Sequence, residues 1–180
     1  MQVLLTACLL VVAAAHLTAT TYLPASFNQI VAESSTIVYG RVAGVRAAWS
    51  DDRRTIDSFV TVQAVDYLKG ARGATLLFRV PGGQVGDRVM VIPGVPSFRE
   101  GDLVVVFLKG ATPAIPHPVG LAQGVFRVIP DPRSGTPLVV PPPIVARGGT
   151  ARIGRGDPAR GPVPFTAFAA EVRGFVEGAR

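Results

Sequence analysis

Few side chains in this sequence could carry out covalent or metal chemistry. The chain has two histidines and one cysteine, and both Cys8 and His16 fall in an apolar N-terminal segment that we expect to be removed. The expected mature chain then keeps only His117, between Pro116 and Pro118. No histidines or carboxylates are paired at the spacing of a metal site, and no serine has the Gly-x-Ser-x-Gly context of a nucleophile elbow. A Ser-His-Asp arrangement that uses His117 stays open, but the sequence predicts a protein that is not an enzyme and that needs no cofactor or metal.

A glycine-rich stretch at residues 80–87, VPGGQVGD, could be a loop that binds phosphate. Such a loop needs a strand before it and a helix after it, whose free N–H groups point at the anion. Here residues 88–92, RVMVI, have the composition of another strand, and no Gly-Lys-Ser/Thr ends the stretch. We therefore interpret these glycines as turn residues.

Two further polar strings could form ligand sites. Residues 51–54, DDRR, have balanced charges, which favours a solvated hairpin tip over an ion site. Arg155, Gly156 and Asp157 spell the integrin-recognition tripeptide, a string that a segment rich in arginine and glycine produces easily. Neither string gives a binding residue that we can assign, so the binding site is unknown at this stage.

The first residues of the chain are typical of a secretory signal peptide. An apolar run extends from Val3 to Ala15 with only Thr6 interrupting it, and small residues suitable for a signal peptidase follow. The run is shorter than the about 18 residues that span a bilayer, so we expect no transmembrane anchor in the mature chain. The string LTAC, which ends at Cys8, resembles a lipoprotein box, but the apolar run continues past it, which argues against lipidation. We expect a secreted or periplasmic protein without disulfides, stabilised by a packed core.

The rest of the chain predicts a mainly β domain, because short runs of β-branched residues follow one another between turn residues. The strands are predicted at residues 36–48, 56–68, 74–80, 89–92, 103–108 and 124–129. The almost wholly apolar run at 103–108 is expected in the centre of the sheet. Gly40 and Gly44 inside the first strand predict a strongly coiled strand.

A helix is predicted at each end of this domain. Phe27, Ile30 and Val31 have the spacing of one apolar helix face. Near the C-terminus, Phe165 and Phe168 begin a second apolar series at helical spacing, which predicts an amphipathic helix.

The net charge of +6 is concentrated between the last long strand and the C-terminal helix. Residues 132–164 contain five arginines and one aspartate among many prolines and glycines, and we predict loop or disorder there, with a short edge strand at 138–140. Such a segment could bind polyanions weakly. No nucleic-acid partner is expected, because aromatic residues for base stacking are sparse there. The predicted organisation is a signal peptide at 1–19, a β-barrel domain at 20–131, a flexible segment at 132–163 and a helix at 164–178.

The order of these elements resembles a group of uncharacterised secreted bacterial proteins. The first strand, TIVYGRV at 36–42, the second strand ending in Leu-Lys-Gly at 68–70, and the string FREGDLVVVFL at 98–108 are also similar to the netrin-like OB barrels of tissue inhibitors of metalloproteinases. That resemblance implies a small OB-like barrel of five or six strands and a companion role to an exported metalloprotease. Those inhibitors chelate the protease zinc through an N-terminal cysteine, which the expected mature chain lacks, so inhibition by that route is not inherited.

The sequence therefore predicts a secreted or periplasmic non-catalytic binding or accessory protein, with an exported protease or another extracytoplasmic protein as its partner. The alternative is an envelope-associated structural protein that is held through its basic segment at 132–163.

Overall fold

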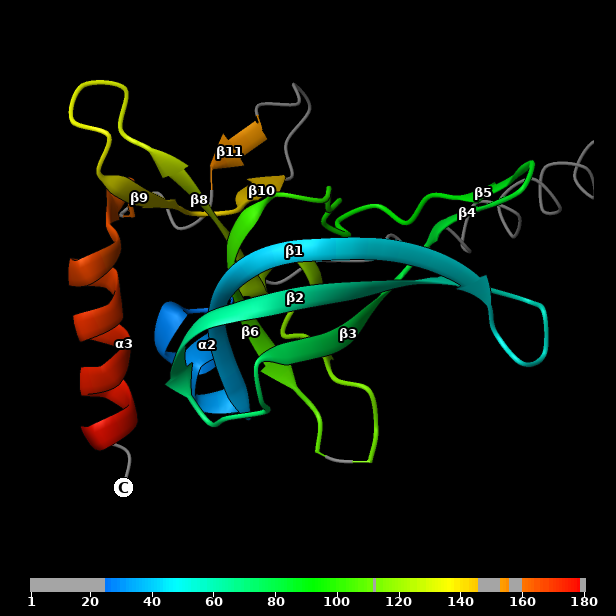
Figure 1. The fold of residues 1–180 in the computed structure, drawn as a ribbon, viewed down its shortest axis with the longest axis horizontal. Coiled ribbons are helices and arrows are strands. Elements are labelled where there is room, and N and C mark those ends of the chain that lie inside the picture. Colours follow the sequence, from blue (N-terminus) through cyan, green and yellow to red (C-terminus); the bar gives the residue numbers. More distant parts are fainter. Residues whose placement is uncertain (1–24, 112, 146–152, 156–159, 179–180) are drawn as a thin grey trace, which may run out of the picture.

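A computed structural model describes residues 25–111, 113–145, 153–155 and 160–178 (Figure 1). The helical elements are α2 (Phe27–Glu33), η2 (Leu121–Gly124) and α3 (Phe165–Gly178). The strands are β1 (Thr36–Trp49), β2 (Ile56–Lys69), β3 (Thr75–Pro81), β4 (Gly83–Val85), β5 (Arg88–Met90), β6 (Leu103–Lys109), β7 (His117–Pro118), β8 (Val125–Pro130), β9 (Pro137–Val140), β10 (Pro143–Val145), β11 (Ile153–Arg155) and β12 (Val163–Pro164). The mainly β prediction is thus confirmed, as are the helices at the two ends of the domain.

The main sheet has the strand order β12-β9-β8-β6-β1-β2-β3, and β7 also pairs with β6. Its pairings are antiparallel. Strand β6 lies near the middle of the sheet, and its residues 104–108 are fully buried, as the apolar run predicts. The long strands β1 and β2 continue past the rest of the sheet as a hairpin, beside which the small β4–β5 hairpin lies (Figure 1).

Strand β1 bends sharply where it pairs with β2. The register shifts at three places along this pair, one of them between Tyr39 and Gly40 and another between Val42 and Gly44. A Cβ atom at Gly40 would come within 2.4 Å of the carbonyl oxygen of Gln63, so only glycine allows the two backbones to approach this closely. Extra residues at such shifts increase strand twist, which explains the coiling that the two glycines predict.

The two helices cover one face of the sheet. Ser26 caps α2, because the Gln29 N–H donates to its hydroxyl at 3.3 Å while the Ser26 N–H donates to the Gln29 side chain at 2.9 Å. Below α2 and α3, aromatic rings meet edge to face. The ring of Phe27 lies 5.7 Å from that of Phe107 and 5.5 Å from that of Phe168. This cluster of phenylalanines fixes both helices on the sheet.

The opposite face of the sheet curls round a second core that is mostly valine. It contains Val42, Val60 and Phe78, all buried, with Phe98 from the loop before β6 packed against them. Buried β-branched residues on strands of this kind pack well across the pleat. The central strands are therefore buried on both faces.

The sheet is not the closed barrel that the sequence predicts. Strands β12 and β3 stand at the two ends of the pairing order. Between β3 and β7 the structure has one backbone bond, from the Arg79 N–H to the Pro116 carbonyl at 2.9 Å. Because Pro116 and Pro118 have no N–H to donate, β7 cannot return the ladder bonds that would close the sheet.

The sheet also continues beyond the expected domain boundary at residue 131. Strand β9 pairs with β8, and Val139 is almost completely buried. It is not the edge strand, since β12 pairs with its other side. Strands β9 and β12 thus extend the sheet into the segment for which loop or disorder is predicted. None of the helices in the described residues has the length and apolar character needed to cross a membrane.

Candidate binding surface

Of the residues that could carry out chemistry, only His117 lies within the described part of the chain. His117 lies exposed on β7, where it pairs with Lys109 through the backbone. Within the described ranges, no three His, Cys, Asp or Glu side chains are grouped as metal ligands would be.

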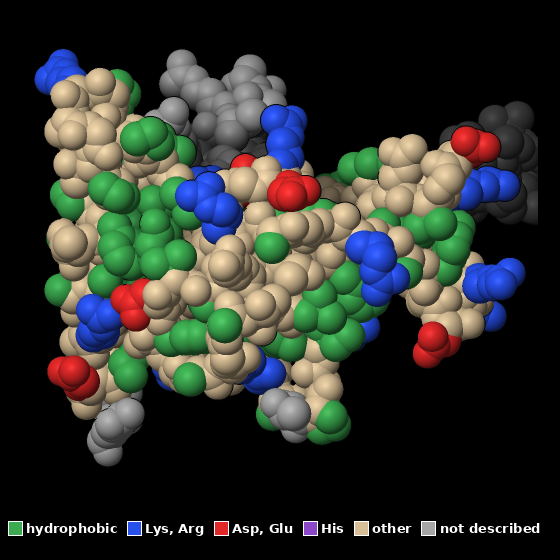
Figure 2. Space-filling model, viewed as in Figure 1, with side chains coloured by type: hydrophobic (Ala, Val, Ile, Leu, Met, Phe, Trp, Pro, Cys, Tyr) green, Lys and Arg blue, Asp and Glu red, His purple; other side chains and the backbone are tan. Residues whose placement is uncertain are grey.

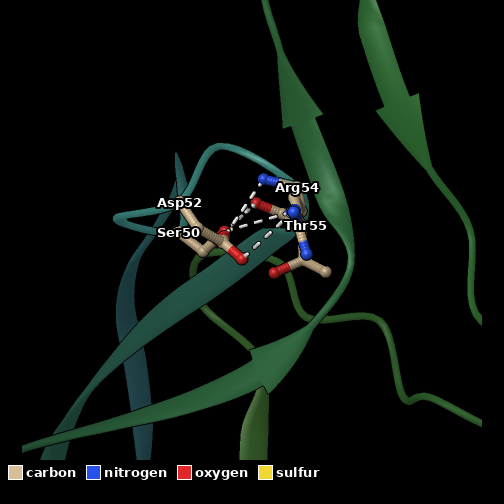
Figure 3. A network of polar contacts seen from close by, with 4 residues as sticks. All are labelled: Ser50, Asp52, Arg54 and Thr55. Carbon is tan, nitrogen blue, oxygen red and sulfur yellow. Dashed lines mark hydrogen bonds and ion pairs between the residues drawn. The ribbon is translucent and has the colours of Figure 1, made fainter.

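The charged string at residues 51–54 forms the turn between β1 and β2 (Figure 3). The carboxylate of Asp52 accepts hydrogen bonds from the Ser50 hydroxyl at 2.6 Å and from the Arg54 N–H at 3.1 Å. The bond from Ser50 is the main reason that the pKa of Asp52 is lowered. Asp52 also lies 3.9 Å from the Arg54 side chain. The acceptors of Asp52 are thus used within the turn, which confirms the interpretation as a hairpin tip.

The glycine-rich stretch at 80–87 is a turn region as well. Gly82 and Gly86 have φ values of 90° and 58°, which favour glycine, and the chain goes on into β5 instead of a helix. A Cβ atom at Gly83 would lie 2.5 Å from the Ser58 hydroxyl oxygen, so this glycine lets the β4–β5 hairpin pack directly on β2. The structure confirms that these glycines make turns and close contacts.

An exposed surface lies on the outer side of β1, β2 and β3. No sequence motif indicates it. Arg46 of β1 stands opposite Phe59 of β2, which stands opposite Arg79 of β3. Thr61 and Leu77 form the next pair on the same side. We call these five residues the β1–β3 surface. Figure 2 shows hydrophobic side chains over β2 and β3 with Lys or Arg side chains next to them.

This surface combines apolar and cationic groups. Leu77 is 41% exposed, and Phe59 is partly exposed. The guanidinium of Arg46 lies 5.3 Å from the centre of the Phe59 ring, a cation–π contact. Arg79 lies 3.6 Å from the Asp57 carboxylate, whereas Arg46 has no carboxylate partner among the described residues. The surface is therefore apolar at its centre and carries unbalanced positive charge at one side.

The register of β2 and β3 positions this surface. Over residues 59–62 of β2 and 76–80 of β3, every second residue points into the valine core, and Val60, Val62 and Phe78 are completely buried there. Strict alternation of buried and exposed residues fixes the register, because a slip by one residue would exchange the two sides. The sequence of β2 already shows the alternation of Val60 and Val62 with more exposed residues. The signal that could have indicated the surface is Phe59, an aromatic residue on the polar side of this strand.

The basic segment is partly engaged with the folded domain. Arg160 forms an ion pair with Glu171 of α3, and its guanidinium lies 3.6 Å from the centre of the Phe27 ring. This arginine is therefore committed to fixing the chain before β12 against both helices. Arg155 ends β11, while Gly156, Asp157, Cys8 and the predicted signal peptide lie outside the described residues.

Fold and surface together define a mainly β domain with two helices on one side of its sheet and an exposed apolar and cationic surface on three strands. No family model matches the chain, and the searches of curated proteins and of solved structures find no match either.

Proposed function

We propose that this chain is a secreted or periplasmic, non-catalytic binding or accessory module that holds a partner protein on the β1–β3 surface. The exposed Leu77, next to Phe59 and two guanidinium groups, is the observation that carries the proposal. Protein interfaces are enriched in aromatic residues and arginine, and exposed apolar side chains on a rigid strand lose little conformational entropy on binding.

The proposed fold relationship supports the choice of this surface. We propose that β1, β2, β3 and β6 correspond to an incompletely closed OB-like unit, since they follow one another in the sheet and curl round one core. In OB folds the face of the second and third strands, with the loop between the first two, is where ligands bind. The resemblance to netrin-like domains makes an exported protease the proposed class of partner.

The test compares the effect on partner binding of substitutions on this surface with that of a matched substitution elsewhere. Leu77→Asp and Arg46→Glu alter the β1–β3 surface, whereas Ile129→Asp places the same new charge at a 47% exposed position of β8. Wild-type protein is immobilised and exposed to the native secretome, the retained protein is purified, and its Kd is measured for each variant.

We expect the two surface variants to weaken binding by about tenfold or more, as loss of a central interface contact does, and Ile129→Asp to leave the Kd unchanged. The change in fluorescence of Trp49, the single tryptophan of the chain, gives an independent measure of binding near the β1–β2 turn. Equal affinity of wild type, Leu77→Asp and Arg46→Glu for every retained protein would reject this surface.

A further inference from the structure

A groove lies where the two helices meet the end of β2. Its volume is about 900 Å³, and residues of α2, the end of β2 and the C-terminal half of α3 line it. Figure 1 shows where these three elements lie. Val31 and Leu68 line it and are otherwise buried, while Phe175 is 36% exposed. The volume falls in the range of about 300 to 1,000 Å³ that is usual for small-molecule sites. The groove is distinct from the β1–β3 surface, since the two share no residue.

The wall formed by α3 leaves space in the groove. Gly174 and Gly178 both line it and are four residues apart, so they lie on the same side of the helix. A Cβ atom at either glycine would meet no other atom within 4 Å. Gly174 lies inside the helix, where glycine is less favourable than alanine, and no crowding among the described residues requires it there, whereas Gly178 is the last residue of the helix.

One charged side chain, Lys69, lines this groove within the part of the chain that the structure describes. Its Nζ donates to the carbonyl oxygens of Val31 at 2.9 Å and Ala32 at 3.4 Å, at the end of α2. An ammonium has three N–H donors, so these bonds leave one for a ligand. Burial lowers the pKa of Lys69, because partial loss of water disfavours its charged form.

The carboxylates of Asp66, in the strand before Lys69, and of Glu33, next to Ala32, are bound to other cations. Asp66 pairs with Arg173 at 2.6 Å, and Glu33 pairs with Lys109 at 3.1 Å. None of the described carboxylates lies within ion-pair distance of Lys69. The groove thus has mostly apolar walls, to which the neutral polar residues Asn28, Ser35 and Tyr67 also contribute. Its single cation has neutral oxygen partners and no counter-ion among the described residues.

We propose that this groove binds an amphiphilic anion, a single carboxylate attached to an unbranched apolar chain. The carboxylate accepts the free N–H of Lys69 and neutralises its charge. The apolar chain lies along Val31, Leu68 and Phe175, over the space left by Gly174 and Gly178. One carboxylate matches one ammonium, whereas an anion of higher charge would leave charge unbalanced in a partly desolvated site.

The experiment measures the affinity of two probes, dodecanoate and its neutral analogue dodecanol, for the full chain by titration calorimetry below the micelle concentration. Lys69→Met removes the cation but keeps an apolar stem, and Arg88→Met is the control at an exposed cation of β5, away from the groove. Gly174→Leu fills the groove without removing charge. Circular dichroism and thermal unfolding of each variant show whether the fold is kept.

We expect dodecanoate to bind wild type about tenfold more tightly than dodecanol, the effect of one partly buried ion pair. In Lys69→Met this preference disappears, while Arg88→Met behaves as wild type. Gly174→Leu, which remains folded, loses both probes. If Lys69 only caps α2, wild type would show no saturable binding of dodecanoate, and this result would overturn the proposal. It would also be overturned if Lys69→Met still prefers dodecanoate to dodecanol, or if folded Gly174→Leu binds both probes as wild type does.

Discussion

Two parts of the same sheet face differ in what covers them. Where β1 and β6 lie under the helices, Ile37 and Phe107 are completely buried against phenylalanines of α2 and α3. Further along, over β1, β2 and β3, the same side of the sheet carries the β1–β3 surface, in which Phe59 and Leu77 alternate with arginine and threonine. The covered part is built for packing, whereas the uncovered part keeps apolar side chains soluble by surrounding them with polar ones.

The difference separates apolar residues that are buried by the fold from apolar residues that stay partly exposed. Burial of an aromatic side chain among other rings contributes to folding through lost water contact and through close packing. A side chain that is only partly buried, as Leu77 is at 41% exposure, contributes less to folding, and its exposed apolar area is open to another explanation. An interface with a partner is the explanation that we propose.

The largest effect is expected from removing a ring in the covered part. Phe107→Ala should lower the free energy of unfolding by about 3 to 5 kcal/mol, because it leaves a cavity between the sheet and both helices. Phe59→Ala, the matched change on the uncovered part, should cost only about 1 to 2 kcal/mol, from partial burial and the contact with Arg46. Urea unfolding of both variants makes the comparison. Equal losses would mean that the β1–β3 surface is part of the core.

The two glycines of β1 give the next comparison, because Gly40 lies where the covered part ends. Gly40→Ala should destabilise by about 1 to 3 kcal/mol, since the new methyl group would overlap the Gln63 carbonyl and the Val62 side chain. Gly44→Ala meets no atom within 4 Å and should stabilise by about 0.5 kcal/mol through the entropy of the unfolded chain. Thermal unfolding distinguishes the two, and a stable Gly40→Ala would show that β1 and β2 can separate there without loss.

Much of the fold was predictable from local patterns. The alternation in β2, the apolar run of β6 and the phenylalanine spacing in α3 each depend on residues that are near in sequence, and the structure confirms them. The closed barrel was wrong because closure depends on which distant strands meet. The prolines on both sides of His117, which stop β7 from completing the ladder with β3, could be read in the sequence, but their position opposite β3 could not.

The two proposed binding sites were harder to predict for the same reason. The β1–β3 surface brings together residues from three strands, and the groove brings Lys69 of β2 to the end of α2 and to two glycines of α3. A sequence motif consists of functional residues that are close together in the chain, and neither site contains such a group. The turn at residues 51–54 was predicted well, because its contacts are all local.

The smallest effect concerns that turn, which connects the two strands of the uncovered part. The Ser50 hydroxyl lowers the pKa of Asp52, so the ionised carboxylate is favoured in the folded state. Its stabilising contribution is complete above the unfolded pKa of about 3.9 and is lost as the pH falls through the lower folded pKa. At neutral pH, Asp52→Asn should therefore be slightly less stable to heat than wild type. This difference should shrink towards zero in strong acid, where the carboxylate of wild type is protonated. Because the turn is exposed and lies away from the helices, the variant should leave the packing of Phe107 unchanged. A difference that grows on acidification would mean that Asp52 is stabilised in its protonated form, and the local network of the turn would then need another explanation.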